Sequence, residues 1–331
     1  AVEDMLGVVE YAGIYIQTPE LEEFILAMDI KAKQQEGLVI NSFKKLRRLI
    51  DERIERHHVY RQGEIALKIQ QDLLPTIPKI AGMDIEGICL SQENVGGDVF
   101  NVLVDGIEVK QQNETIVKPE KISCYVIDAE GHGIPAAMRC RDTYQSFKFG
   151  NQLNLKVAEI MESTNKNMTS PTAEHVLYTT AFYMEIFCLA EEVSFAYANA
   201  GHPSPIHYQR QAGKTTFLTV PDPSRAAREE YKKKGYLFNQ AFGMFPKVKY
   251  IFTNGRLGNG DTVLLYSDGI TEARNPQGDL YGQERLARAL IESNEGSAKE
   301  ISKHILAEVN RFCRSSPADD DRTVLVVKRL E

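Results

Sequence analysis

The feature that most constrains the fold is the change of sequence pattern at Leu74-Pro75. After this point short apolar runs of strand length, such as MDIEGICL, ISCYVIDA, TTAFYMEIFCL and TVLVVKRL, alternate with turns rich in Gly, Pro and Asn. Two helical stretches, at about 135–167 and about 283–313, interrupt the strands in blocks. Antiparallel sheets permit this order, whereas a doubly wound fold needs a helix after each strand. We therefore predict an α+β domain over residues 76–331.

Residues 1–75 have a pattern typical of charged helices. From Phe43 to Ile54 the apolar residues recur at steps of three and four, with Lys, Arg and Glu between them. Such a stripe indicates a helix, and Pro75 ends it because proline cannot continue a helix. The stripe either packs on its own domain or forms a coiled-coil or crossed-helix contact in a homodimer. We predict that residues 1–75 form a helical regulatory or linker segment.

The charge balance and the cysteines exclude several classes of partner. Acidic residues outnumber basic ones, 46 to 39, for a net charge of -7, whereas nucleic acids and anionic membranes attract clustered Lys and Arg. No apolar run reaches the roughly 20 residues needed to span a bilayer, and the start of the chain does not resemble a signal peptide. The five cysteines follow no metal-binding spacing, which is typical of reduced thiols. We expect a cytoplasmic protein that contacts neither nucleic acid nor, through this segment, a membrane.

Four acidic residues stand at the ends of apolar runs. They are Asp98 in VGGD, Asp128 in YVIDAEGHG, Asp268 in TVLLYSDG and Asp320 in the DDD before TVLVV. One Asp at a strand end is ordinary, because Asp favours turns. Four of them beside buried runs should converge at one end of a sheet stack, where protonation or a bound divalent cation relieves their repulsion. Oxygen ligands suit Mg²⁺ or Mn²⁺, and paired ions of this kind activate water for in-line attack on phosphorus.

Other catalytic classes lack their motifs. The sequence contains no GxxxxGK[ST] phosphate-binding loop and no GxSxG nucleophile motif. None of the cysteines has the local context of a phosphatase nucleophile. These absences favour a metal-dependent hydrolase of phosphoesters.

The motifs around the aspartates show a family resemblance. In order, VGGD, DAEGHG, NAGHPSP, YSDGITEA and DDRTVLVV, preceded by QQDLLPTIP, resemble the bacterial sporulation and stress-response branch of the protein phosphatase 2C (PPM) family. The resemblance covers roughly residues 64–331. It implies a β-sandwich of two antiparallel sheets flanked by helices, with two Mn²⁺ or Mg²⁺ ions bound at one edge. It also implies hydrolysis of phosphoserine or phosphothreonine.

The resemblance implies a role for each aspartate. Asp98 matches the first acidic site. Asp128 matches the residue that bridges the two metal ions, and the Ala129 backbone carbonyl is a further candidate ligand. Asp268 and Asp320 match the pair that completes the shell of one metal. All four aspartates are therefore expected to be catalytic as metal ligands.

The last ligand position is ambiguous by one residue. Asp320 is favoured over Asp321, because the family pattern has Thr three residues after the ligand and Thr323 stands there. One position departs from the branch, which usually has a small residue where this chain has Glu130 before GHG. This carboxylate either adds charge near the metals or points outward.

Two histidines and two insertions complete the predictions. His132 is a conceivable general acid, although a structural hydrogen bond within its loop is favoured, and His202 is predicted to be a turn residue beneath the site. The segment 106–121 is expected to form a hairpin or loop. The charged segment 221–236 is expected to be a solvated loop or a short exposed helix.

These observations predict a phosphoserine/phosphothreonine protein phosphatase with metal-bound water as the nucleophile. By resemblance, the substrate is a phosphorylated anti-anti-sigma-type regulator in a bacterial partner-switching pathway. One alternative is a pseudophosphatase or signalling scaffold that binds phosphoproteins without turnover, which the intact aspartates disfavour. Another is a metal-dependent hydrolase of small phosphoesters on the same fold.

Overall fold

The computed structural model describes residues 74–92, 96–111, 114–169, 177–189, 192–314 and 318–331, together with the single helical residues Arg48 and Arg53. The chain divides into two compact units, residues 1–65 and 66–331. The predicted helical segment 1–75 and its dimer contact lie almost wholly outside the described residues. They stay predictions, as does the boundary at residue 75. The description below concerns the second unit.

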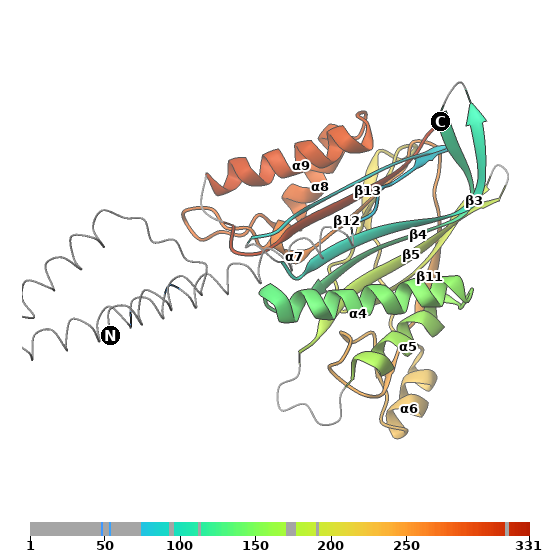
Figure 1. Ribbon diagram of the computed structural model, residues 1–331, viewed down its shortest axis with the longest axis vertical. Helices are drawn as coiled ribbons and strands as arrows, with labels where there is room; N and C mark the ends of the chain where they lie inside the picture. The colour runs from blue at the N-terminus through green and yellow to red at the C-terminus, as the bar shows by residue number, and fades with distance from the viewer. Residues whose placement is uncertain are drawn as a thin grey trace, which may run out of the picture. The chain divides into compact units, whose positions relative to one another are not determined.

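A single curled sheet of eleven strands dominates this unit (Figure 1). The strand order is β11-β6-β5-β4-β1-β2-β13-β12-β7-β8, with β3 also paired to β4. The strands of this sheet are β1 (Lys79–Ile80), β2 (Met83–Leu90), β3 (Asp98–Gln111), β4 (Glu114–Ala129), β5 (Thr179–Leu189), β6 (Glu192–Ala200), β7 (Ile206–Gln209), β8 (Lys214–Phe217), β11 (Phe252–Arg256), β12 (Thr262–Tyr266) and β13 (Arg322–Arg329). The two-residue strands β9 (Leu237–Phe238) and β10 (Val248–Lys249) form a separate parallel pair.

The two predicted antiparallel sheets are the two halves of this sheet, and the short strand β1 joins them. Ile80 of β1 pairs antiparallel with Met83 of β2 and parallel with Val117 of β4. The other pairings in the sheet are antiparallel. The predicted α+β class with flanking helices is confirmed, and the term sandwich describes the two halves loosely, because β1 makes them continuous.

Helices cover the outer face of each half (Figure 1). The described helices of this unit are α4 (Gly133–Gln152), α5 (Val157–Met168), α6 (Arg225–Lys233), α7 (Asp268–Thr271), α8 (Gly282–Ser293) and α9 (Ala298–Cys313). The helices α4 and α5 pack on the half that contains β4 and β5, whereas α8 and α9 pack on the half that contains β12 and β13. The result is four layers, helix-sheet-sheet-helix.

The alternation of side chains along each strand produces these layers. In β4, Cys124 and Val126 enter the core between the two halves, while Tyr125 and Ile127 face α4 and α5. Strand β13 alternates in the same way, with Leu325 between the halves and its neighbours under α8 and α9. A strand buried on both faces reads as a continuous apolar run, which is why the sequence shows the strands so clearly.

Each predicted helical stretch consists of two helices. After α4 the chain turns through Asn154, whose φ of 51° is left-handed, a conformation that Asn tolerates better than most residues. Between α8 and α9, Ser297 caps the start of α9 and forms a reciprocal capping box with Glu300, a motif that begins a new helix. Local turn and capping residues therefore account for the breaks in both helical stretches.

Both predicted insertions have the expected form. The segment 106–121 extends the β3–β4 hairpin beyond a register shift at Asp105/Gly106. The segment 221–236 contains α6, an exposed helix with an ion pair of 3.1 Å between Arg225 and Glu229. Among the described residues, no helix is both long and apolar enough to cross a bilayer.

Candidate metal centre

The centre begins with two aspartates on neighbouring strands. Strand β3 starts at Asp98, β4 ends one residue after Asp128, and the two residues are direct partners in the antiparallel pair. Directly opposed residues in such a pair have Cβ atoms about 4.5–5.5 Å apart and point to the same face. Asp98 is only 2% exposed. Two carboxyl groups thus meet at one edge of the sheet, where solvation is poor.

Electrostatics disfavour ionisation of this pair. Burial raises the pKa of Asp98 to about 8, although hydrogen bonds from the hydroxyls of Ser267 and Thr323 act in the opposite direction. Burial also raises the pKa of Asp128 well above its ordinary value, and the charges of the neighbouring aspartates raise it further. Carboxylates in this position need either a proton or a cation.

The other half of the sheet contributes Asp268. Strand β12 ends just before Ser267, and Asp268 opens the single turn of α7. Burial raises the pKa of Asp268, and the charges of Asp320 and Glu272 add to the effect. The charge of Asp268 in turn raises the pKa of Asp128. A divalent cation bound there would relieve this repulsion.

The structure separates the roles of Asp320 and Asp321. The Asp321 carboxylate is buried and accepts hydrogen bonds from three backbone amides: Gln92 at 2.7 Å, Gly97 at 2.5 Å and Asp98 at 3.2 Å. Asp320 is exposed, and one of its oxygens accepts from the Asp321 amide at 2.8 Å. Asp321 therefore anchors the chain before β3, which leaves Asp320 as the candidate ligand.

Two glycines allow these segments to approach one another. A Cβ at Gly97 would lie 2.5 Å from the Ala129 carbonyl oxygen, and a Cβ at Gly269 would lie 1.9 Å from the Asp321 carbonyl oxygen. Both distances are far below van der Waals contact, so only glycine fits. The glycines beside the aspartates hold the ends of β4 and the segment before β13 close to the site.

The donor set fits a hard divalent cation. Asp98, Asp128, Asp268 and Asp320 come together at the edge where the two halves meet, and their charges raise one another's pKa values. Within the described residues, no group of three or more His, Cys, Asp or Glu side chains is placed to hold a metal ion; Asp98 and Asp128 oppose each other as a pair. Mg²⁺ usually keeps several waters and needs only one or two carboxylates, so pairs suffice. The ligand roles, including that of the Ala129 carbonyl, stay predictions.

Thr180 is a supporting residue that the sequence did not reveal. It lies opposite Asp128 on β5, and its hydroxyl is 2.9 Å from Nδ1 of His202 and 3.4 Å from the Asp128 carbonyl oxygen. Burial lowers the pKa of His202 to about 3, so this imidazole is neutral at physiological pH. His202 thus lies beneath the site, as predicted, and its neutral ring is unsuited to donate a proton as an imidazolium.

Two further residues reach the centre electrostatically. The charge of Glu272, four residues after Asp268, contributes to the raised pKa values of Asp268 and Asp320; the i, i+4 spacing was the signal that could have revealed it. Burial and then the charges of Glu130, Asp128 and Asp268 raise the pKa of Tyr178. No sequence pattern marks Tyr178, since it precedes β5 and reaches the site only through the fold.

The loop between β4 and α4 contains the predicted Glu130 and His132. Both are exposed, the Glu130 amide donates to the Tyr178 carbonyl at 3.0 Å, and His132 occupies the position before the first residue of α4. The flanking Gly131 and Gly133 have φ values of 87° and 77°, which favour glycine. Glu130 therefore points outward, and its charge acts on Tyr178.

Comparison with known proteins agrees with the motifs. The family described as "Stage II sporulation protein E (SpoIIE)" matches residues 118–330, more than half of the chain. Phosphoserine phosphatase RsbU of Bacillus subtilis (strain 168) is 24% identical over 267 residues, which cover 80% of this chain and 69% of that protein.

Solved structures show the same fold. The SiaA-PP2C domain of Pseudomonas aeruginosa aligns with a TM-score of 0.62 at 18% identity, over 84% of this chain and 99% of that one. The PP2C phosphatase domain of SpoIIE from Bacillus subtilis, solved with a fragment of its regulatory domain, aligns with a TM-score of 0.56 at 17% identity, over 76% and 64%. The chain therefore belongs to the SpoIIE family, within the sporulation and stress-response branch of the bacterial PPM protein phosphatases.

Proposed function

We propose that this protein is a metal-dependent phosphatase of phosphoserine or phosphothreonine in a regulatory protein. The observation that supports it most is the opposition of Asp98 and Asp128 across β3 and β4, with the charge of Asp268, from the other half of the sheet, acting on Asp128. When bound, two Mn²⁺ or Mg²⁺ ions would supply Lewis acidity and activate water at neutral pH.

The residues of the chain would perform two tasks in this reaction. Asp98, Asp128, Asp268 and Asp320, with the Ala129 carbonyl, would hold the cations. The Asp321 carboxylate would keep the segment before β3 in place through its three amide contacts.

The proposed substrate is a phosphorylated regulator of the anti-anti-sigma type, acting in a partner-switching pathway of the cytoplasm. Family membership and the similarity to phosphoserine phosphatase RsbU support this choice. All five cysteines are free thiols, which supports a reducing compartment. A homodimer through the 1–75 segment is part of the same proposal, with a regulatory role for that segment.

The test is Mn²⁺-dependent hydrolysis of p-nitrophenyl phosphate and of a phosphoserine peptide by wild type, Asp128→Asn and Asp268→Asn. Mutation of a residue that hydrogen-bonds to a metal ligand typically lowers metal affinity or activity by about 10–100-fold. Loss of a ligand itself should therefore lower kcat/KM by about 100-fold or more. Asp222→Asn is the matched control, since Asp222 is exposed and pairs with Arg228 at 2.7 Å. Unchanged activity in both site variants would refute the proposal.

The same assay separates the two rivals. A pseudophosphatase would leave both probes intact in the presence of Mn²⁺ and would still bind the phosphopeptide. A hydrolase of small phosphoesters would turn over free phosphorylated metabolites much faster than the phosphopeptide. The four convergent aspartates favour the protein phosphatase over the pseudophosphatase, because a decayed site would be expected to lose one.

A further inference from the structure

A hollow of about 520 Å³ opens between α8 and α9. Four arginines and two glutamates line it, namely Arg285, Arg288, Arg311, Arg314, Glu292 and Glu308. The hollow is therefore basic in a chain whose net charge is -7. We refer to it as the arginine pocket.

Two of the four arginines are held by the protein itself. Arg285 donates to the carbonyl of Tyr281 at 2.9 Å and stacks over the ring of Phe312, 4.9 Å from its centroid. Arg311 is paired with Glu308 one turn earlier on α9. These contacts hold the two guanidinium groups on the wall of the pocket.

The other two arginines have no such partner. Arg288 and Arg314 are exposed, and the guanidinium group of neither makes a hydrogen bond or an ion pair with any of the residues that the structure describes. Each guanidinium has five N–H donors in a planar fork that matches carboxylate and phosphate oxygens. Up to ten donors at the rim are thus available to an anionic partner.

Helix electrostatics account for only part of this arrangement. Basic residues stabilise the C-terminal end of a helix, which explains Arg311 and Arg314 at the end of α9. The same rule disfavours basic residues near a helix start, yet Arg285 lies in the first turn of α8 and Arg288 one turn later. The arginines of α8 therefore call for another explanation.

The pocket is connected to the candidate metal centre on both sides. The Tyr281 amide, on the pocket wall, donates to the Ala273 carbonyl at 2.8 Å, and Ala273 follows directly on the α7 segment that bears Asp268. On the other wall, Arg314 precedes Asp320 by six residues. Figure 1 shows α7, α8 and α9 on the same face of the sheet. A protein bound at the carboxylates would extend toward this pocket.

We propose that the arginine pocket binds an acidic segment of the phosphoprotein substrate, outside the phosphorylated residue. This inference rests on the proposed function. Without metals the centre is a cluster of carboxylates that repels an acidic phosphoprotein, and a basic pocket beside it would offset the repulsion and orient the substrate. Arginines spread over two helices suit several carboxylates along a chain better than one small ion.

The test uses a fluorescent hexaglutamate peptide as the probe, with binding followed by anisotropy at low and high salt. Wild type should bind it, and 0.3 M NaCl should weaken binding, because exposed charges are screened. Arg288→Glu/Arg314→Glu should bind about tenfold more weakly or worse, since two favourable contacts become repulsive. The double alanine variant removes both positive charges without adding negative ones, so its affinity for the peptide should lie between those of wild type and the double Glu variant.

The control and the activity readout distinguish the pocket from the metal centre. Arg225→Glu/Arg256→Glu changes the charge by the same amount at exposed positions on α6 and β11 and should bind the peptide like wild type. Mn²⁺-dependent hydrolysis of p-nitrophenyl phosphate should be unchanged in all pocket variants, because this small ester does not reach the arginines. Failure of the proposed function would appear as absence of that hydrolysis in wild type.

Any of three outcomes would overturn the inference. One is that wild type does not bind hexaglutamate at low salt. Another is that the double Glu pocket variant binds it as tightly as wild type. The third is that wild type binds a hexalysine peptide with equal affinity, since this would show that the contact is not charge-specific.

Discussion

The Asp321 carboxylate anchors a segment beside the candidate metal centre through backbone hydrogen bonds. Asp321 is 5% exposed and accepts from three backbone amides in the segment 92–98. Charge-assisted hydrogen bonds of this kind are about twice as strong as neutral ones. The neighbouring Asp320 is exposed and belongs to the group of carboxylates whose charges interact. Of these two adjacent acids, Asp321 therefore has the structural role and Asp320 is the candidate metal ligand.

The two aspartates should respond differently to substitution. Asp321→Ala leaves three amides without their acceptor and should lower the free energy of unfolding by about 3 kcal/mol or more. Asp320→Ala should change it by less than about 1 kcal/mol, as is usual for exposed positions, while weakening Mn²⁺ binding. Urea unfolding and Mn²⁺ titration by calorimetry measure the two effects. The division of roles is wrong if Asp320→Ala is the more destabilising substitution.

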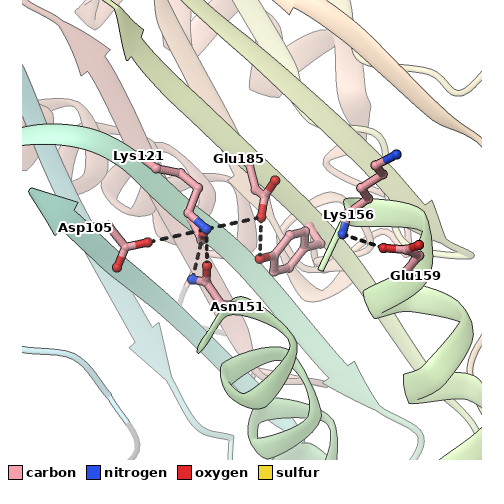
Figure 2. A network of polar contacts seen from close by, with 8 residues as sticks. Asp105, Lys121, Asn151, Lys156, Glu159 and Glu185 are labelled. Atoms are coloured by element: carbon pink, nitrogen blue, oxygen red, sulfur yellow. Dashed lines mark hydrogen bonds and ion pairs between the residues drawn. The ribbon is translucent and has the colours of Figure 1, made fainter. Parts of the chain in front are cut away.

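Among the elements, α4 connects the metal centre with a distant polar cluster. The helix begins next to the glycine-rich loop after Asp128 and ends at Gln152. At its far end Asn151 accepts a hydrogen bond of 2.5 Å from Lys121 and donates one of 2.9 Å to Ser123 (Figure 2). The Lys121 ammonium also lies 3.9 Å from Glu185 on β5. This cluster ties the C-terminal end of α4 to two strands.

The balance of charge in this cluster predicts a pH-dependent stability. Burial raises the pKa of Glu185 and the Lys121 charge counteracts it. Lys121→Met should lower the free energy of unfolding by about 2 to 4 kcal/mol at pH 8, because a nearly buried carboxylate loses its cation. A carboxyl group with a raised folded-state pKa gives stability at low pH that is lost as pH rises through that pKa. The deficit of Lys121→Met should therefore be smaller at pH 5.

A matched substitution checks this prediction. Lys118→Met removes the same charge from an exposed position on the same strand and should cost less than about 0.5 kcal/mol. Urea unfolding of both variants at pH 5 and pH 8 provides the comparison. Equal losses for the two lysines, or a deficit that does not change with pH, would show that the Lys121–Glu185 interaction contributes nothing measurable.

At the scale of the whole molecule, the metal centre joins the two halves of the sheet. Asp98 and Asp128 belong to β3 and β4, whereas Asp268 and Asp320 border β12 and β13. In the metal-free protein their mutual repulsion opposes the closure of the two halves. Cations bound between these aspartates would stabilise the fold as well as supply chemistry, since a ligand that binds only the folded state adds RT ln(1 + [L]/Kd) to its stability.

The raised carboxyl pKa values predict how metal and pH act together. The pKa of Asp98 is about 8, above its ordinary 3.8, so its contribution to stability is present at low pH and is lost as pH rises through about 8. The Tm in EDTA should therefore fall between pH 6 and pH 8.5. Mn²⁺ should raise the Tm more at pH 8.5 than at pH 6, because protons compete with the metal. At 100 times Kd the stabilisation is about 2.7 kcal/mol.

Differential scanning fluorimetry with Asp128→Asn as the comparison tests this coupling. The variant should lose most of the Mn²⁺ increment at pH 8.5, whereas Asp222→Asn should keep it. An increment that is the same at both pH values, or that survives in Asp128→Asn, would contradict a centre built on these carboxylates.

Sequence alone could predict the α+β class, the strands and the four aspartates, because each depends on local patterns. A strand that is buried on both faces is continuously apolar, and an Asp beside a Gly marks the end of such a strand. Both patterns are the same wherever the strand lies in the sheet. The hairpin of 106–121 and the exposed helix of 221–236 were predictable for the same reason. Cap and turn residues such as Ser297 also marked the helix breaks, although the pattern of apolar residues obscured them.

Only the tertiary structure decided what depends on contacts between distant segments. The junction of the two halves through β1, the contact of Thr180 with His202 and the proximity of Tyr178 to Glu130 join residues far apart in the chain. The choice between Asp320 and Asp321 belongs here as well, because it rests on amides more than 220 residues away. Local chemistry determined which residues could serve the site, and long-range packing determined which of them face it.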